Sequence, residues 1–396
     1  MARLPPHQRD EYKSDFRVGD DGITNGRVEA TSEIREKFWR HWCDYCGPIG
    51  IDPYLDEESF QDTIRTATGF AGRVRKGRYG HGRQVQTGSV RAALGGVNAT
   101  IALDTGRRPL HEKGAVEKYV LPIQHMLKGF EREDPPTVKK LAIHPDLPDW
   151  LCKWGHRRGA SEHSKAIGDL EMIAFYFLLR VGEYTAPKKR GRQPRTKQFT
   201  VNDVTFFTID ANGFFTPLPL HASESELLTA VAATLRITDQ KNAFKGACVH
   251  HGALEGESHA CPVKALARRV AHIRKHTKRG DTMLCAFWDE IGRGDVTDKD
   301  MSLHMKFAAA SLGYPARNIP LAQIDTHSNR AGGACAMKLA GYDDESIRKM
   351  GRWLPSSNAF LEYIQQQLSG FSQGMSNKMR RIAKFTNMEG SANHSG

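Results

Sequence analysis

Apolar residues recur at three- and four-residue steps over the first third of the chain, after a polar segment at residues 1–30 that we expect to be flexible. From Thr31 onward the period is set by Ile34, Phe38 and Trp42, and it predicts an amphipathic helix. Three further helices are expected, at residues 57–74, 89–103 and 116–130. Four helices in so short a stretch predict a small helical bundle.

The remainder of the chain mixes helical and alternating patterns. Residues 131–136 combine charged side chains with two prolines, which predicts a linker. A strongly apolar helix is expected at residues 164–185, ending near Arg180 and Glu183. Strands are expected at residues 204–209, 232–238 and 247–250, with a hairpin between the last two, and helices at 262–276 and 296–312.

The expected fold class is therefore mainly α with a small antiparallel β-sheet. A chain of 396 residues is long enough for two domains that each bury a core. We expect a helical N-terminal domain and a mixed α/β domain. The expected divisions are a flexible segment at residues 1–30, the helical domain at 31–133, the mixed domain at 137–385 and a flexible tail at 386–396.

The charge balance favours a polyanionic partner. The chain has 57 Lys and Arg against 45 Asp and Glu, a formal net charge of +12, which points to nucleic acid before membrane. No apolar run is long enough for a membrane span, and the N-terminus lacks the apolar core of a secretory signal. Seven irregularly spaced cysteines suit free thiols in a reducing compartment, so we expect an intracellular protein.

One stretch near the C-terminus carries several residues able to act on phosphate. His327 and Arg330 stand three apart at an expected helix start, and Gly341 and Asp343 mark the end of that helix and the cap of the next. Gly-Arg-Trp, ending at Trp353, follows. Ser356 or Ser357 then caps a last helix that contains Tyr363.

Each of these residues also has an ordinary structural interpretation. A histidine at a helix start is commonly a cap or a core residue, and His-x-x-Arg alone is a weak signal. Trp353 and Tyr363 could both be packing aromatics. Arg180 could simply pair with Glu183 one turn later. Only the combination of these residues, in this order, favours a catalytic role over a structural one.

That combination resembles the signature of the tyrosine recombinases, the phage-integrase and Cre superfamily. The local sequence, with Ala-Gly-Gly after Arg330 and Gly-Arg-Trp before Tyr363, looks most like that of recombinases of eukaryotic mobile elements, crypton-like or DIRS-like. The resemblance implies a helical core-binding domain that clamps DNA, followed by a catalytic domain. It also matches Arg180 to the first catalytic arginine, with Glu183 as its acidic companion.

The resemblance further implies a lysine on the mobile β-hairpin, for which Lys241 is the choice and Lys245 the alternative. Tyr363 would attack a DNA phosphodiester, Arg180 and Arg330 would neutralise the phosphate, and Trp353 would donate its N–H to a phosphate oxygen. His327 would act as a base or phosphate donor, and Lys241 would protonate the leaving oxygen. The interval from Trp353 to Tyr363 is slightly long for the family.

The implied function is site-specific integration or excision of a mobile element in double-stranded DNA by a homo-tetramer, in the nucleus of a eukaryotic host and otherwise in the cytoplasm or nucleoid. No metal, cofactor, membrane or small-molecule substrate is expected. Two alternatives remain: a recombinase-derived DNA-binding protein that no longer cuts, and a type IB topoisomerase-like activity. A generic helical scaffold with a basic surface is a third.

Several other features have no favoured function. Cys43 and Cys46 form a Cys-x-x-Cys without a second pair, which indicates structural thiols. Residues 188–197 form a basic loop that could contact DNA, act as a nuclear address or be solvated. A basic helix at 262–276 could likewise face solvent or DNA. A zinc site is not favoured, because the only close set has an uncommon spacing: Cys248, His250, His259 and Cys261.

Overall fold

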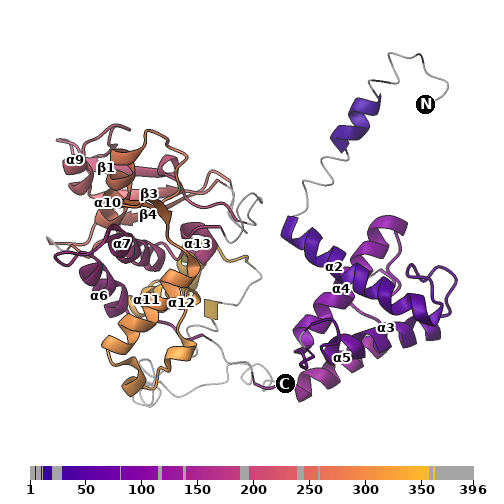
Figure 1. Cartoon of the computed structure of the whole chain (residues 1–396). Helices are drawn as coiled ribbons and strands as arrows, with labels where there is room; N and C mark the ends of the chain where they lie inside the picture. Colours follow the sequence, from indigo (N-terminus) through magenta and orange to yellow (C-terminus); the bar gives the residue numbers. More distant parts are fainter. Residues whose placement is uncertain are drawn as a thin grey trace, which may run out of the picture. The chain divides into compact units, whose positions relative to one another are not determined.

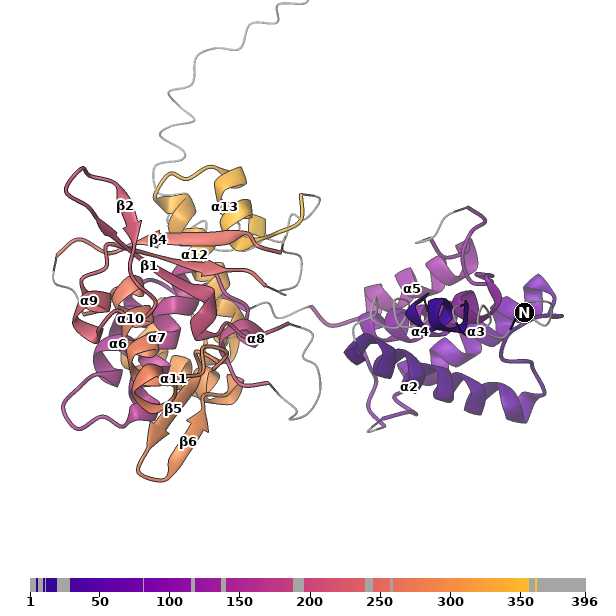
Figure 2. The same ribbon diagram turned by 90° about the horizontal axis from the view of Figure 1, so that it is seen from above.

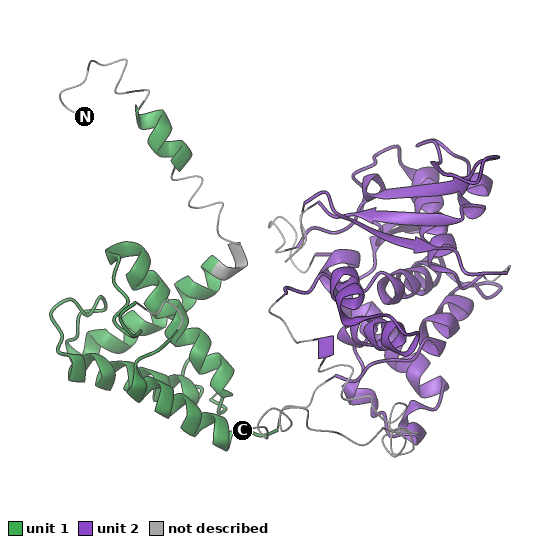
Figure 3. Ribbon diagram, turned by 180° about the vertical axis from the view of Figure 1, so that it is seen from behind, with its two compact units in different colours: residues 1–137, 193–195 green, residues 138–192, 196–396 purple. Residues whose placement is uncertain are grey.

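The computed structural model describes residues 5, 10, 12–19, 29–80, 82–114, 118–136, 140–187, 196–238, 245–256, 259–355 and 360–361. These residues fall into two compact units, residues 1–137 with 193–195 (unit 1) and residues 138–192 with 196–396 (unit 2), coloured separately in Figure 3. Unit 1 has one hydrophobic cluster and unit 2 has three. Residues 12–19 are helical with exposed side chains, in a segment where the sequence predicts flexibility.

Unit 1 contains the four helices that the periodicity predicts. They are α2 (Glu29–Cys46), α3 (Phe60–Arg75), α4 (Thr87–Thr105) and α5 (Leu121–Glu133), with a 3-10 turn at η1 (Gly47–Ile49). The start of α5 lies later than expected because Pro122 takes a first-turn position, where its missing N–H costs nothing. The helix also continues through Glu133, so the predicted linker at 131–136 begins several residues too early.

The core of unit 1 is built on Trp42. The ring is fully buried, donates its N–H to the Pro53 carbonyl at 2.8 Å and meets Phe70 edge-on at 5.1 Å between centroids. Leu94 from α4 packs into the same cluster. Ile34, which the periodic pattern places with Trp42, is instead exposed, so the apolar stripe of α2 is shorter than predicted.

Unit 2 is a helical assembly with a small sheet on one side (Figure 1). Its α-helices are α6 (Asp146–Gly155), α7 (Glu162–Tyr176), α8 (Val181–Tyr184), α9 (Glu224–Leu228), α10 (Pro262–His276), α11 (Asp298–Ser311), α12 (His327–Leu339) and α13 (Asp344–Gly351), with 3-10 turns at η2 (Val201–Asp203), η3 (Tyr314–Arg317) and η4 (Leu321–Gln323). The prediction of a mainly α fold with a small antiparallel sheet is thus confirmed.

The sheets of unit 2 are antiparallel throughout their described strands. The larger has the order β2 (Phe215–Pro217), β1 (Val204–Ile209), β3 (Ala232–Arg236) and β4 (Cys248–Gly252), and a second pair joins β5 (Ala286–Asp289) to β6 (Gly292–Asp295). The register pairs Leu235 with Val249, which confirms the predicted β3–β4 hairpin. Strands β2, β5 and β6 were not predicted. Figure 2 shows the β5–β6 hairpin at the end of unit 2 away from α13.

The apolar helix expected at 164–185 is wrong as a single element. Helix α7 ends at Tyr176, and Leu178 takes a left-handed conformation with φ of +48°. Such a φ is unfavourable for a residue with a Cβ, and the backbone cannot continue as an α-helix through it. A new one-turn helix, α8, starts after Arg180. The break turns the Leu178 carbonyl and the Arg180 side chain toward α12 and α13.

Helices α12 and α13 follow the sequence prediction closely. Gly341 has φ of +92° after α12, and the Asp343 side chain caps α13 by accepting from the Ser346 N–H at 2.6 Å. Both helices pack together, with α12 also against α7 (Figure 1). No helix among the described residues is long and apolar enough to span a bilayer.

Candidate anion-binding site

Arg330 is the centre of a group of buried charges in unit 2. Its side chain projects from the first turn of α12 and only 5% of the residue is exposed. The guanidinium donates to the Leu178 carbonyl at 2.7 Å and to the Gly351 carbonyl. A buried guanidinium needs such acceptors, because removing a charge from water without partners is costly.

The Ala-Gly-Gly that follows Arg330 has a steric reason. A Cβ at Gly332 would collide with the Ile143 carbonyl, and a Cβ at Gly333 would lie 2.5 Å from the Phe175 carbonyl. Glycine at both positions lets α12 approach the end of α7 closely. That approach brings Arg330 to the carbonyl that the break at Leu178 exposes.

Trp353 covers one face of the Arg330 guanidinium. The Arg330 Cζ lies 4.1 Å from the centroid of the indole, a cation–π arrangement. The ring occupies the space that a side chain at residue 351 would take, so Gly351 is required there. Trp353 also packs on Phe360, with centroids 5.5 Å apart. The tryptophan is therefore held in place by contacts on two sides.

Arg180 and Glu183 form the pair that the sequence leaves open as a structural interpretation. The Glu183 carboxylate is fully buried and accepts from the Arg180 backbone N–H at 2.8 Å and from Nη1 of the same residue at 3.3 Å. The Arg180 Nη2 also donates to the Arg352 carbonyl at 3.5 Å. Its side chain is 22% exposed, so this guanidinium is both anchored and reachable from solvent.

Arg352 is a third guanidinium in the group, and sequence reasoning missed it. The residue is 7% exposed and donates to Glu183 at 2.7 Å and to the Leu178 carbonyl at 3.3 Å. Its Nε and Nη1 are buried without a hydrogen-bond partner among the described residues. Its φ of +55° follows the end of α13, where glycine is usual. Its place inside the Gly-Arg-Trp sequence was the available signal.

The group brings three positive charges together. Arg180 and Arg352 both donate to the carboxylate of Glu183, and Arg330 and Arg352 both donate to the Leu178 carbonyl. Burial lowers the pKa of Arg352, Glu183 opposes this by raising it, and the positive charge of Arg180 lowers it further. Electrostatic interactions are strong in a buried region of low dielectric such as this one. An anion with several acceptor oxygens, such as a phosphodiester, complements this arrangement.

A neutral polar network lies behind Arg330. Asn329, the preceding residue, is fully buried and donates to the Glu171 carboxyl at 2.9 Å. Burial raises the pKa of Glu171 to about 8, so this carboxyl is protonated at neutral pH. Burial also raises the pKa of the neighbouring Tyr184 well above its usual value. The network therefore adds no negative charge to offset the three guanidiniums.

The remaining predicted site residues either lie away from the three arginines or fall outside the described residues. His327 is exposed at the start of α12, in a different environment from buried Arg330, and no hydrogen bond joins its ring to the three arginines among the described residues. Lys245 is described and exposed after the hairpin tip. Lys241 and Tyr363 lie outside the described residues, as do most of the basic loop at 188–197 and of the last predicted helix.

The interpretation of the basic helix needs correction, whereas the disfavoured zinc set needs none. Arg269 in α10 is buried and donates to the Leu284 and Ala286 carbonyls, so this part of the helix faces the core rather than solvent or DNA. Among the described residues, the set of Cys248, His250, His259 and Cys261 is not gathered into a metal-sized group. The described cysteines are all free, as expected for Cys43 and Cys46.

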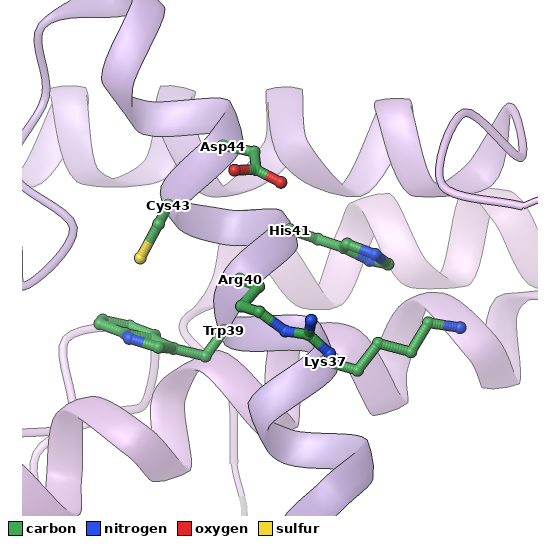
Figure 4. Close-up of a pocket in the computed structure, with 6 residues that line it drawn as sticks. All are labelled: Lys37, Trp39, Arg40, His41, Cys43 and Asp44. Atoms are coloured by element: carbon green, nitrogen blue, oxygen red, sulfur yellow. The ribbon is translucent and has the colours of Figure 1, made fainter.

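Unit 1 presents a surface with basic side chains around α2, beside the acidic Asp44. Lys37 and His41 project to one side of the helix and Trp39 to the other, with Arg40 beside Lys37 (Figure 4). His41 stacks on Tyr79 at 4.3 Å between centroids. An adjoining hollow is lined by Lys37, His41, Tyr79 and Arg83 among others. By contrast, Arg75 is buried against Asp134 and two carbonyls, so it is removed from this surface.

When the chain is compared with known proteins, matches are found among solved structures and not among family models or curated sequences. No protein-family model matches the chain, and no curated protein sequence is similar to it. The Tn1549 transposon integrase in complex with circular intermediate DNA is 12% identical, with 81% of this chain and 86% of that chain covered and a TM-score of 0.41.

Two further solved structures are recombinases. The XerH site-specific recombinase bound to palindromic difH substrate, a post-cleavage complex, is 12% identical over 80% of this chain and 72% of that chain, with a TM-score of 0.44. The XerA recombinase is 11% identical over 88% of this chain and 100% of that chain, with a TM-score of 0.34. At these scores the likeness assigns neither a family nor an activity to this chain.

Proposed function

We propose that the protein is a DNA strand-breaking and rejoining enzyme of the tyrosine-recombinase type. The observation that carries the proposal is the convergence of Arg180, Arg330 and Arg352, which are joined through the Glu183 carboxylate and the Leu178 carbonyl. Three converging guanidiniums suit a phosphodiester whose negative charge increases during reaction. The order of His327, Arg330, Trp353 and Tyr363 along the chain adds the resemblance to a known signature.

The proposed reaction is a transesterification that needs no energy source. The hydroxyl oxygen of Tyr363 attacks phosphorus, a new P–O bond to tyrosine forms, and the bond from phosphorus to the 5′-oxygen breaks. The tyrosine proton passes to a base, for which His327 is the candidate, and Lys241 gives a proton to the leaving 5′-oxygen. A second hydroxyl reverses the step on a different strand and restores the DNA backbone.

Several of the described side chains would stabilise the negative charge of the phosphate, each from a different position. Arg180, the most exposed of the three arginines, would make the direct contact with a non-bridging oxygen. Arg330 and Arg352 would stabilise the same charge from behind, since a low dielectric extends the reach of a buried charge. Trp353, stacked on Arg330, would offer its indole N–H to the phosphate.

Unit 1 would bind the DNA duplex through its basic surface. Lys37 and Arg40 are exposed on α2 and suit sequence-independent phosphate contacts. Replacing either by glutamine should weaken binding on all sequences equally and reduce the slope of log affinity against log salt by about one. Arg75→Gln is the buried comparison. Fluorescence-anisotropy titrations over a range of salt concentrations measure this.

More specifically, we propose that the protein is the recombinase of a mobile element, because its sequence around the site resembles crypton-like and DIRS-like enzymes. It would act as a homo-tetramer on paired double-stranded sites, in the nucleus if the host is eukaryotic. The reaction as written uses no metal and no small-molecule cofactor. A requirement for two DNA sites distinguishes this activity from a topoisomerase-like enzyme, which relaxes supercoils on one duplex.

The test is covalent capture on nicked DNA. The protein is incubated with a library of nicked duplexes of randomised sequence, so that a preferred site need not be known, and is then denatured and separated. The proposal expects a protein–DNA adduct, a phosphorylated tyrosine in the peptide that contains Tyr363, and loss of both in Tyr363→Phe. Captured DNA is sequenced to identify the site.

Other results would change the conclusion. An adduct that persists in Tyr363→Phe would move the nucleophile, with Tyr342, which is exposed, tested next. Tight, salt-sensitive binding with no adduct across the library would favour a recombinase-derived DNA-binding protein. Relaxation of supercoiled DNA without any joining of separate duplexes would favour the topoisomerase-like alternative.

A further inference from the structure

A second group of reactive side chains lies in unit 2, apart from the three arginines. Cys152 and His156 stand one turn apart at the end of α6, and His259 precedes α10. One potential ligand atom from each lies within 4.8 Å of the others, so the three could share a single ion. The chain distance between Cys152 and His259 is 107 residues, so the sequence gives no local motif for this group.

Close helix packing brings the group together. A Cβ at Gly155 would lie 2.5 Å from the Ser164 carbonyl, and one at Gly168 would lie 2.7 Å from the Leu151 carbonyl. Glycine at these positions lets α6 and α7 approach closely. The approach places the end of α6 against Asp169 of α7, which is buried.

Asp169 gives His156 the partner that a metal-binding histidine usually has. The Asp169 Oδ1 lies 2.9 Å from His156 Nε2, an interaction that fixes the ring orientation. A carboxylate hydrogen-bonded to one ring nitrogen favours metal binding at the other. The ring of His156 meets that of His259 edge-on, with centroids 4.4 Å apart.

We propose that Cys152, His156 and His259 bind a zinc ion that ties α6 to the segment before α10. One thiolate and two imidazoles form a ligand set typical of zinc, which is borderline soft and accepts sulfur and nitrogen together. The fourth position is left to water, which can enter through a cleft of about 620 Å³ lined in part by His156, Asp169 and Arg268. The ion would lie apart from the arginines that the proposed reaction uses, and we expect it to hold α6 against the segment before α10.

Zinc binding to this group follows ordinary thiol chemistry. Binding forms the S–Zn bond and releases the thiol proton to solvent, so affinity should increase with pH.

Arg268 provides the competing explanation. Its Nη2 donates to the Cys152 sulfur at 3.3 Å and its Nε donates to Asp169 at 2.8 Å. In one explanation, the hydrogen bonds from Arg268 alone satisfy the Cys152 sulfur and the Asp169 carboxylate, and no metal is needed. In the proposed site the same N–H···S contact stabilises the thiolate that binds the ion. The two views differ in whether metal is bound, which is measurable.

The test measures metal on the full-length protein purified without a metal-affinity column. The proposal expects stoichiometric zinc by elemental analysis, and a near-ultraviolet thiolate-to-cobalt band after exchange into Co²⁺. His259→Gln, a change at an exposed position, should lose the bound metal while the helical circular-dichroism signal stays. Cys152→Ser should lose the thiolate band. A chelator should lower the melting temperature of wild type and leave His259→Gln unchanged.

Matched controls separate this site from the other cysteines and histidines nearby. Cys248→Ser and His250→Gln change residues on β4 and should keep full zinc content and the cobalt band. Wild-type protein without stoichiometric zinc, and without a cobalt thiolate band, would overturn the proposal in favour of Arg268 alone. Zinc that survives both Cys152→Ser and His259→Gln would place the ion elsewhere and equally overturn it.

Discussion

Two of the buried arginine sites, one from each unit, differ in the number of guanidiniums that they bring together. In unit 1, Arg75 pairs with Asp134 and donates to the Val85 and Phe130 carbonyls, while Asp134 also accepts from the Thr87 N–H at 2.8 Å. In unit 2, three guanidiniums converge: two donate to the Glu183 carboxylate, and the third, that of Arg330, donates to the Leu178 and Gly351 carbonyls.

The difference separates a structural arginine from one suited to bind a ligand. Arg75 joins α3 to the ends of α4 and α5, and each charge at that site has an opposite partner. The unit 2 site has three guanidiniums close together, a left-handed backbone at Leu178 and Arg352, and polar atoms without partners among the described residues. Strain and clustered like charges of this kind are typical of functional sites.

The largest effect is expected at Arg330. Arg330→Lys keeps a positive charge but loses the planar fork that reaches two carbonyls and the indole face. We expect the rate of covalent capture to fall roughly 10²–10³-fold, the usual result of removing one donor that stabilises a transition state. Single-turnover capture on the selected DNA measures this rate. An unchanged rate would reduce Arg330 to a packing residue.

Arg75→Met is the counterpart in unit 1. It removes one partner of a buried pair and leaves the Asp134 carboxylate without its cation, so the melting temperature should fall by several degrees. The capture rate per folded molecule should stay at the wild-type value, because this charge belongs to the fold alone. Thermal unfolding followed by circular dichroism, and active-site titration, give the two numbers. A stable but inactive variant would contradict the distinction.

Arg352→Gly should lower the capture rate less than Arg330→Lys does. In contrast to Arg75→Met, it should change the capture rate and leave stability nearly unchanged. Glycine relieves a left-handed residue by about 1 kcal/mol, which offsets the lost contacts to Glu183 and Leu178. Capture should fall by roughly tenfold, as expected for about 1.4 kcal/mol of lost charge stabilisation. Arg352→Lys should recover part of the rate. Full activity in Arg352→Gly would mean that two arginines suffice.

The smallest expected effect concerns the neutral network behind Arg330. The folded pKa of Glu171, about 8, lies above its unfolded value, so folding takes up a proton and stability falls as pH rises between the two values. The slope should be about 1.4 kcal/mol per pH unit at most. Glu171→Gln keeps the carbonyl acceptor for Asn329 and should flatten this slope. Urea unfolding at pH 5 to 8 measures it, and parallel slopes would contradict the assignment.

Much of the secondary structure could be predicted because its signals are local. Periodicity and capping located α2 and the pair α12–α13, and alternation located the β3–β4 hairpin. The break at Leu178 could not be predicted, since an unbroken apolar run looks like one helix, and the break depends on tertiary contacts with α12 and α13. Strand β2 is a short, exposed edge strand without alternating burial, so it leaves little pattern in the sequence.

The site could be predicted only in part, for a similar reason. Arg180, Arg330 and Trp353 were identified from a resemblance in order and spacing. They lie close together, because the two arginines donate to the adjacent carbonyls of Arg352 and Gly351 and Trp353 stacks on Arg330. Arg352 was missed because an arginine after a helix end is normally expected at the surface. The Cys152 and His259 pair was missed because only folding joins residues so far apart.

The most direct test of the central claim changes the charge of the DNA instead of the protein. Once capture has identified the attacked linkage, that phosphate is replaced by a neutral methylphosphonate, and single-turnover cleavage is measured with wild type and Arg330→Ala. If the three guanidiniums neutralise the phosphate, cleavage by Arg330→Ala should be severely slowed on natural DNA and largely recovered on the neutral linkage. Equal impairment on both substrates would show that Arg330 acts through the fold and not through the phosphate charge.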